Sequence, residues 1–181
     1  MNAGGHGRET VEVLRRAWVL DLLGGGRGGG DEGGVPLAAS VRDASDLALG
    51  YRRSNLRPSE VVTAAAFAVT PDDAAACEAR VTEIVRWRRQ HQPGGQNAGS
   101  VFRNPPGDSA GRLIDAAGLK GLRVGGAVVS EKHANFLQAE TGATARDVLD
   151  LVAEVQRRVA KTSGVELVPE LHVVGDDQGA E

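Results

Sequence analysis

The chain has 181 residues, of which 41% are apolar and 25% are charged, a composition typical of a globular protein with one or two domains. A formal net charge of -3 gives no broad basic field, and aromatic residues make up only 3%, so nucleic acid is excluded as the main partner. The single cysteine, Cys77, excludes an internal disulfide, and no apolar stretch is long enough for a bilayer, so we expect a reduced cytoplasmic protein and no membrane insertion.

Two strands and a glycine-rich connection are predicted in the first third of the chain. Residues 11–23, VEVLRRAWVLDLL, are apolar and β-branched, which favours a strand. Eight glycines follow between Gly24 and Gly34, without the lysine and helix start of a phosphate-binding loop, so we interpret this run as a flexible connection. Residues 44–60 predict a short helix and a turn, and residues 60–70, EVVTAAAFAVT, predict a buried strand.

A helix is predicted from Thr70 to about Gln90. Thr70 is a suitable N-cap, and Pro71 suits the first helical position because its fixed φ matches the helix. Apolar residues recur at helical spacing on one face, so that Cys77 is expected to be a small core residue. This face comprises Cys77, Val81, Ile84 and Val85.

The segment QPGGQNAG, residues 92–99, ends the helical pattern and predicts a domain boundary, because its glycines and proline interrupt regular structure. We therefore expect a partial flavin-binding domain at 1–92, a second domain at 93–175 and a disordered tail at 176–181. The flavin assignment follows from the resemblance described below.

Two helices and two strands are predicted in the second half. Ser109 is expected to cap a short helix that Gly118 ends, and residues 122–130 and 134–140 predict two strands. Thr144 opens a longer helix. Its apolar face comprises Val148, Leu151, Val152, Val155 and Val159.

The chain is predicted to end in extended structure after Gly164, which stops the last helix. Residues 165–174, VELVPELHVV, predict a terminal strand pair or one bent strand that Pro169 interrupts. Helices and strands therefore alternate irregularly, which predicts an α+β fold: part of one domain followed by an α+β domain.

Motifs for catalysis and metal binding are few. The four histidines show no metal-ligand spacing, so no metal site is predicted. Ser100, in Gly-Ser-Val-Phe, lies outside the nucleophile elbow of α/β-hydrolases, and its spacing alone favours a helix cap. Arg52 and Arg53 follow a glycine and a tyrosine, a setting that suits phosphate or carboxylate binding.

Several long motifs in order resemble one enzyme family. GSVFRNPPGDSAGRLIDAAGLKGLRVGGAVVSEKHANFLQ, ATARDVLDLVAEVQRRV and GVELVPELHVVG resemble the C-terminal part of the UDP-N-acetylenolpyruvoylglucosamine reductases, flavoenzymes of peptidoglycan precursor synthesis. MNAGGHGRE resembles the flavin-binding stretch of this family, and LGYRRS resembles its Gly-Tyr-Arg-x-Ser motif.

The resemblance implies a reaction and its residues. NADPH is expected to reduce FAD, which delivers hydride to the enolpyruvyl double bond of UDP-N-acetylglucosamine enolpyruvate. The resemblance implies that Ser100 donates the proton, that Arg52 polarises the substrate carboxylate and that Glu170 positions or protonates the intermediate. It also implies that Tyr51, Asn104 and Lys120 bind substrate and that Asn2, Ala3, Gly4 and Gly7 contact the flavin.

The position of the first motif is unusual. In this family the Met-Asn-Ala-Gly motif lies inside the chain, whereas here its methionine is Met1. The resemblance therefore implies that the N-terminal portion of the FAD domain is missing, and we expect these 181 residues to bind FAD weakly or not at all. Two alternatives remain: a UDP-sugar-binding module without redox activity, and a non-functional remnant or half that needs a separately encoded N-terminal partner.

Overall fold

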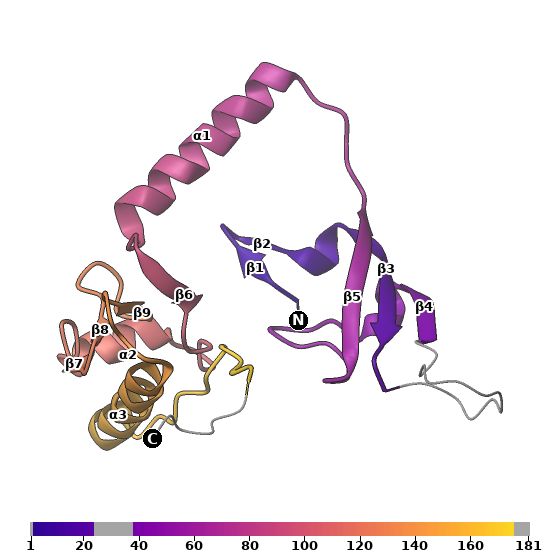
Figure 1. The fold of residues 1–181 in the computed structure, drawn as a ribbon. Coiled ribbons are helices and arrows are strands. Elements are labelled where there is room, and N and C mark those ends of the chain that lie inside the picture. Colours follow the sequence, from indigo (N-terminus) through magenta and orange to yellow (C-terminus); the bar gives the residue numbers. More distant parts are fainter. Residues whose placement is uncertain (1, 24–37, 176–181) are drawn as a thin grey trace. The chain divides into compact units, whose positions relative to one another are not determined.

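Residues 2–23 and 38–175 are described by a computed structural model, which has the expected α+β fold (Figure 1). The chain forms two compact units, Met1–Cys77 (unit 1) and Glu78–Glu181 (unit 2), and each is described by itself. The glycine run at 24–34 and the tail at 176–181 lie outside the described residues.

Unit 1 contains a small hairpin and a three-stranded antiparallel sheet of order β4-β3-β5. Alternating burial along β3 places Leu14, Ala17 and Val19 in a small core with Leu47. The elements are β1 (Gly4–Gly5), β2 (Arg8–Glu9), the 3-10 helix η1 (Thr10–Glu12), β3 (Leu14–Asp21), β4 (Ala38–Asp43), the 3-10 helix η2 (Ala44–Leu47) and β5 (Glu60–Phe67).

The strand predicted at 60–70 is present as β5, but the prediction that it is buried is wrong. Every residue of β5 is exposed or half-buried, and none belongs to the small core of unit 1 in the described ranges. On the outer side of the sheet, Trp18 lies between Val41 and Ala64 in the ladder, and both Trp18 and Val41 are exposed. Hydrophobic composition therefore predicted the strand correctly and its environment incorrectly.

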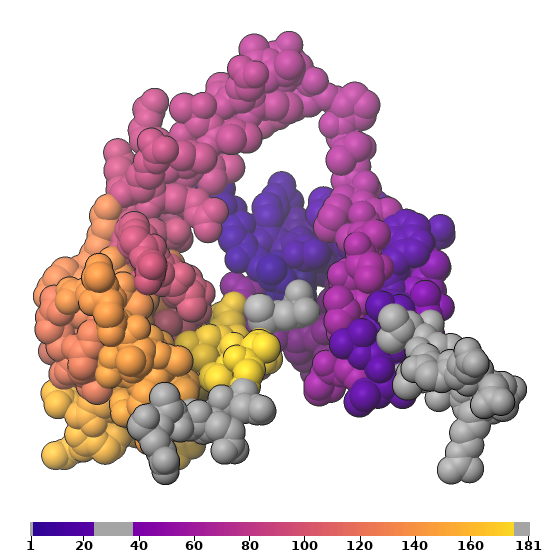
Figure 2. All heavy atoms as spheres, viewed as in Figure 1, coloured from indigo at the N-terminus to yellow at the C-terminus, as the bar shows by residue number. Residues whose placement is uncertain are grey.

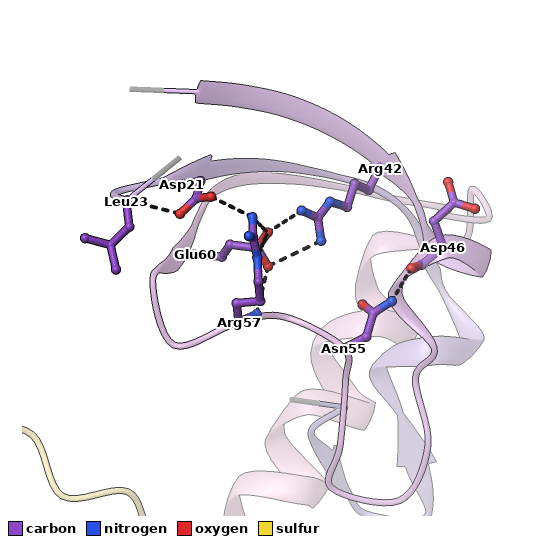
Figure 3. Close-up of polar contacts among 7 residues, drawn as sticks. All are labelled: Asp21, Leu23, Arg42, Asp46, Asn55, Arg57 and Glu60. Atoms are coloured by element: carbon purple, nitrogen blue, oxygen red, sulfur yellow. Dashed lines mark hydrogen bonds and ion pairs between the residues drawn. The ribbon is translucent and has the colours of Figure 1, made fainter. Parts of the chain in front are cut away.

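A network of charged side chains joins the three strands of this sheet (Figure 3). Glu60, whose side chain is fully buried, accepts hydrogen bonds from Arg42 and Arg57, and Arg57 Nη2 also donates to Asp21 Oδ2 at 2.6 Å. These bonds lower the pKa of Glu60 to about 2, and the bond from Arg42 has the largest effect. Asp21 and Glu60 face each other in the β3–β5 ladder, so the register of the sheet brings the two carboxylates together, and Arg57 from the loop before β5 bonds to both.

The long helix α1 (Ala74–His91) begins later than the sequence predicts. Asp73 Oδ2 accepts a hydrogen bond from Ala76 N at 2.9 Å, so Asp73 caps the helix and the predicted N-cap at Thr70 is wrong. An aspartate nearer the helix is the stronger competitor for the free N–H groups. The predicted apolar face is not buried: α1 has no buried residue, and its surface is visible in Figure 2. Cys77 is half-buried rather than a core residue.

Unit 2 contains a four-stranded antiparallel sheet of order β6-β9-β8-β7, covered by two helices. Ser109 and Thr144 cap these helices as predicted, and Gly118 and Gly164 follow their ends with positive φ. The elements are β6 (Gln96–Ser100), α2 (Ala110–Ala116), β7 (Arg123–Val124), β8 (Ala127–Val129), β9 (Phe136–Ala139) and α3 (Ala145–Ser163).

The core of unit 2 lies between the helices and the sheet. The predicted face of α3 is confirmed, because Leu151, Val152, Val155 and Val159 are buried and Val148 packs against them. They contact Ile114 of α2 and Val129 of β8 in one cluster. The site described below lies at the edge of this core.

Three strand predictions in unit 2 need correction. Residues 122–130 form two strands joined at Gly125, whose φ of +52° favours a tight turn, instead of one strand. Residues 165–174 form no strand, and their pairing is limited to an isolated bridge between Pro169 and Phe102, since proline has no N–H for a ladder. The segment at 92–99, predicted as a break, contains the start of β6.

Candidate functional site

A pocket of about 450 Å³ in unit 2 contains several of the expected site residues. Ser100, Asn104 and Lys120 all line it, although they come from the end of β6, the following turn and the loop after α2. The prediction that Ser100 is a helix cap is wrong, because Ser100 ends strand β6 opposite Phe136. The remaining lining residues are Ser109, Gly111, Arg112, Asp115, Lys132, His133, Ala134 and Asn135.

Local hydrogen bonds fix the polar groups of this pocket. Asn104 Oδ1 accepts from Ala110 N at 3.1 Å, which places the asparagine over the N-terminus of α2. Lys120 Nζ lies 2.8 Å from Asp115 Oδ2, so the cation is held at the C-terminal side of the same helix. The turn that brings Lys120 to the pocket depends on Gly118, whose φ is +69°.

The pocket is rich in cations. Arg112 pairs with Asp108, and this bond, with one from Ser109 N, lowers the pKa of Asp108 to about 2. Lys132 Nζ donates to Arg89 O. With Lys120, three cations therefore line one opening, an arrangement that suits an anionic ligand.

His133 contributes an imidazole whose neutral form is favoured. Burial lowers the pKa of His133, and the charge of Lys120 adds to the effect. The ring stands edge-on to Phe136, and its Nδ1 accepts a hydrogen bond from Asn135 N at 3.2 Å. His133 can therefore donate through Nε2 toward a ligand without adding charge.

Glu170 lies beside residues 101–103, the segment that follows Ser100. Its N–H donates to Val101 O at 2.7 Å, and Arg103 N donates to Val168 O at 2.9 Å. These two bonds flank the Phe102–Pro169 bridge and fix the terminal segment against residues 101–103. The structure therefore brings the main chain of Glu170 within one residue of Ser100.

The other group of expected residues lies in unit 1, around Arg52. Arg52 has a φ of +53°, in the left-handed region, within the turn closed by Gly50 and Arg53. Its guanidinium lies 5.0 Å from the ring centre of Tyr51 and 4.0 Å from Glu9 Oε1, and Nη2 donates to Gly4 O at 3.4 Å. A Cβ on Gly4 would lie 2.8 Å from Arg52 Nη1, so only glycine allows this approach.

The hairpin at the start of the chain presents its main chain to solvent. Asn2 is fully buried and holds the hairpin, since its Nδ2 donates to Glu9 Oε2 at 2.9 Å and its Oδ1 accepts from Val11 N. A Cβ on Gly5 or Gly7 would meet no atom within 4 Å. This open backbone fits the approach of a flat ring such as a flavin.

Several residues near these groups had no expected role. The pocket of unit 2 is also lined by Arg112, Lys132, His133 and Asn135, and Glu9 lies beside Arg52. All of these lie within motifs that resemble the reductase family, but a single sequence gives no signal that separates them from structural residues. Among the described residues, no cluster of histidine, cysteine, aspartate and glutamate could hold a metal ion. No helix in the described ranges is long and apolar enough to cross a membrane.

Comparison with known proteins identifies a domain and the relatives of this chain. Residues 90–174 match the model of the C-terminal domain of UDP-N-acetylenolpyruvoylglucosamine reductase. A curated protein of that name from Alkalilimnicola ehrlichii is 45% identical over 98% of this chain, and one from Syntrophotalea carbinolica is 45% identical over 97%. Residues 90–174 therefore carry the C-terminal domain of the UDP-N-acetylenolpyruvoylglucosamine reductases, and nearly the whole chain is similar to proteins of that name.

A solved structure supports the same family. The crystal structure of UDP-N-acetylenolpyruvylglucosamine reductase from Thermus caldophilus is 37% identical and superposes with a TM-score of 0.74 over 95% of this chain. The chain spans about half the length of these relatives: 56% of the Alkalilimnicola protein and 57% of the Thermus chain. The similarity therefore includes both units of this chain and only part of each relative.

Proposed function

We propose that this chain takes part in the flavin-dependent reduction of UDP-N-acetylglucosamine enolpyruvate to UDP-N-acetylmuramate, a cytoplasmic step of peptidoglycan precursor synthesis. The observation that supports it most is the convergence of Ser100, Asn104 and Lys120 on one cation-lined pocket. The cations suit the diphosphate of a UDP-sugar, and the hydroxyl suits a proton donor.

The proposal requires FAD and NADPH as cofactors. Asn2, Ala3, Gly4 and Gly7 would hold the flavin, and the open backbone of the β1–β2 hairpin is consistent with that role. When bound, the flavin supplies the hydride and NADPH supplies the electrons that restore it.

This chain's own residues bind the substrate and move a proton. Arg52 would hold the carboxylate of the enolpyruvyl group, with Tyr51 packed beside its guanidinium. Asn104 and Lys120 would contact the UDP-sugar. Ser100 Oγ would donate a proton to the carbon next to the carboxylate, where negative charge develops, and Glu170 would orient or protonate the same centre.

A titration tests whether the chain binds its cofactor. FAD is added to the purified protein while visible absorbance is recorded, and NADPH then follows under anaerobic conditions. Saturable binding and bleaching of the flavin would support the enzyme. Binding of a UDP-N-acetylglucosamine derivative by a protein that stays colourless would instead indicate a sugar-binding module, and binding of neither would contradict both.

The Ser100→Ala variant tests the proton donor. We expect reduction of the flavin by NADPH to stay within about twofold of wild type, while reoxidation by substrate slows by roughly 100-fold or more, the size of a general acid contribution. Ser163→Ala removes a hydroxyl that bonds to Val159 O in α3 and should change neither rate. Equal slowing of both half-reactions in Ser100→Ala would show that Ser100 is not the donor.

A further inference from the structure

The residue that lies between the two proposed proton-handling residues, Val101, is hydrogen-bonded on both sides. Val101 follows Ser100 directly, its N–H donates to Asn135 O at 2.9 Å, and its carbonyl accepts from Glu170 N at 2.7 Å. One residue, Val101, therefore connects the β6 end, the β8–β9 turn and the terminal segment.

The side chain of Asn135 holds the next residue in the same way. Asn135 is 4% exposed; its Oδ1 accepts from Phe102 N at 2.9 Å, and its Nδ2 donates to Phe102 O at 2.8 Å. A main-chain N–H can only donate and a carbonyl can only accept, so these partners determine the orientation of the amide. Both polar groups of Phe102 are satisfied by one side chain.

This arrangement compensates for the end of a strand. The β6–β9 ladder ends at the Ser100–Phe136 pair, because β9 begins at Phe136. Beyond that pair, none of the described strands lies beside Phe102 on this side, and the primary amide of Asn135 takes the place of a peptide group. Buried main-chain groups without such a partner would be costly, so the amide keeps residues 101–102 extended.

The turn that presents Asn135 is itself fixed. Ser130, which is buried, accepts through Oγ from Lys132 N at 3.1 Å and from His133 N. His133 Nδ1 accepts from Asn135 N, and His133 O accepts from Phe136 N at 2.9 Å. The amide is therefore held by its own backbone as well as by its partners.

We propose that Asn135 is a positioning residue that fixes Ser100 relative to Glu170, an inference that rests on the proposed function of those two residues. The two hydrogen bonds between the Asn135 side chain and the main chain of Phe102, called the clamp below, hold the chain just after Ser100. Val101 bonds to Asn135 O through its N–H and to Glu170 N through its carbonyl. Loss of the clamp moves the hydroxyl with respect to the carboxylate. A displacement of about 1 Å costs roughly 100-fold in rate, which makes the effect measurable.

Two variants and a matched control test the proposal. Asn135→Ala removes both side-chain bonds to Phe102, whereas Asn135→Asp keeps the acceptor and loses the donor to Phe102 O. Val155→Ala is the control, because Val155 is fully buried in α3 within the same core and lies outside the pocket. It destabilises unit 2 without touching the clamp.

The first readout is amide hydrogen exchange, which needs no cofactor. We expect Asn135→Ala to raise exchange at Phe102, Val101 and Glu170 at least tenfold above the change that Val155→Ala causes at the same amides, because local opening removes their protection. Asn135→Asp should raise it less, since Phe102 N keeps its acceptor. Equal exchange in Asn135→Ala and Val155→Ala would overturn the clamp.

The second readout separates positioning from stability. We expect reoxidation of reduced flavin by substrate to slow roughly 10- to 100-fold in Asn135→Ala, with reduction by NADPH unchanged. Val155→Ala should leave the ratio of the two rates as in wild type. An unchanged ratio in Asn135→Ala, with wild type active, overturns the inference. A wild-type chain with neither half-reaction overturns the proposed function instead.

Discussion

At the scale of single residues, the guanidinium of Arg52 lies so close to Gly4 that no side chain fits at that position. The guanidinium lies against Gly4 and Glu9 and over the ring of Tyr51, while its own backbone has positive φ. A cation held on several sides can bind a carboxylate with little loss of side-chain freedom. Its position therefore depends on the absence of a side chain at Gly4.

Gly4→Ala should displace Arg52. The new Cβ would lie 2.8 Å from Nη1, and the flexible end of the arginine would move, since the φ of Gly4 is not positive. We expect the NMR signal of Arg52 Nε–Hε to shift and the affinity for substrate to fall roughly 10- to 100-fold, the contribution of a hydrogen bond to a charged group. Gly5→Ala, where a Cβ meets nothing within 4 Å, should leave the Arg52 signal in place. A shift of equal size in both variants would contradict the steric argument.

At the scale of elements, capping explains where the long helix of unit 2 begins. Thr144 Oγ1 accepts from Asp147 N at 3.1 Å, and Asp147 Oδ2 accepts from Thr144 N at 2.9 Å, which forms a reciprocal capping box. Asp147 also accepts from Gly126 N at 3.2 Å, so the cap ties the β7–β8 turn to the helix. The bonds to Thr144 N and then Gly126 N lower the pKa of Asp147.

Thr144→Ala should lower the free energy of unfolding of unit 2 by about 1 kcal/mol, the usual cost of an N-cap. Thr162→Ala, in the last turn of the same helix, should change it by less than about 0.5 kcal/mol, because exposed positions contribute little. Urea unfolding followed by circular dichroism measures both. A cost for Thr162→Ala as large as that for Thr144→Ala would show that the cap is not the cause.

The charged cluster that joins the three strands of unit 1 predicts a response to acid. The pKa of Glu60 is depressed to about 2 by Arg42 and Arg57, whereas an unfolded glutamate titrates near 4.3. The unfolded chain therefore binds protons first as pH falls, so this contribution is complete above about pH 4.3 and is lost as pH falls toward 2. Thermal unfolding of wild type should shift steeply over this interval.

Glu60→Gln removes the titrating group and should flatten the response to acid. We expect its melting temperature to be lower than that of wild type at pH 7 and to change less between pH 5 and pH 2. Glu78→Gln, an exposed position of α1, should follow the wild-type curve. Parallel curves for wild type and Glu60→Gln would mean that another group causes the acid sensitivity.

The elements differ in how far the sequence could predict them. The α3 helix followed from Thr144, Gly164 and an apolar face at helical spacing, because each of these is a local signal. The exposure of β5 did not, since apolar composition does not show whether another layer covers a strand. The clamp by Asn135 was also beyond the sequence: it depends on where β9 begins relative to β6, a non-local pairing. The pocket was predictable only residue by residue, through motifs of the family, and its cations Arg112 and Lys132 were not.

At the scale of the whole molecule, the two units differ in the amount of apolar surface that they bury. In the described ranges, the core of unit 1 consists of Leu14, Ala17, Val19 and Leu47 with a few half-buried neighbours. The core of unit 2 joins both of its helices, its central strands and the segment at Leu167. Because burial of apolar area dominates stability, unit 2 should be the more stable of the two.

Hydrogen exchange of the intact chain tests this difference. We expect amides of β8, β9 and α3 to exchange much more slowly than those of β3, whose outer neighbours β4 and β5 are exposed edges. Slow exchange confined to unit 2 would also mean that unit 1, with Arg52 and the glycine hairpin, needs a partner or cofactor to become equally rigid. FAD should then slow exchange at β1 and β2 before it affects α3, since a ligand stabilises what it binds. Equal protection of β3 and α3 without FAD would show that the small core of unit 1 is enough to make it as rigid as unit 2.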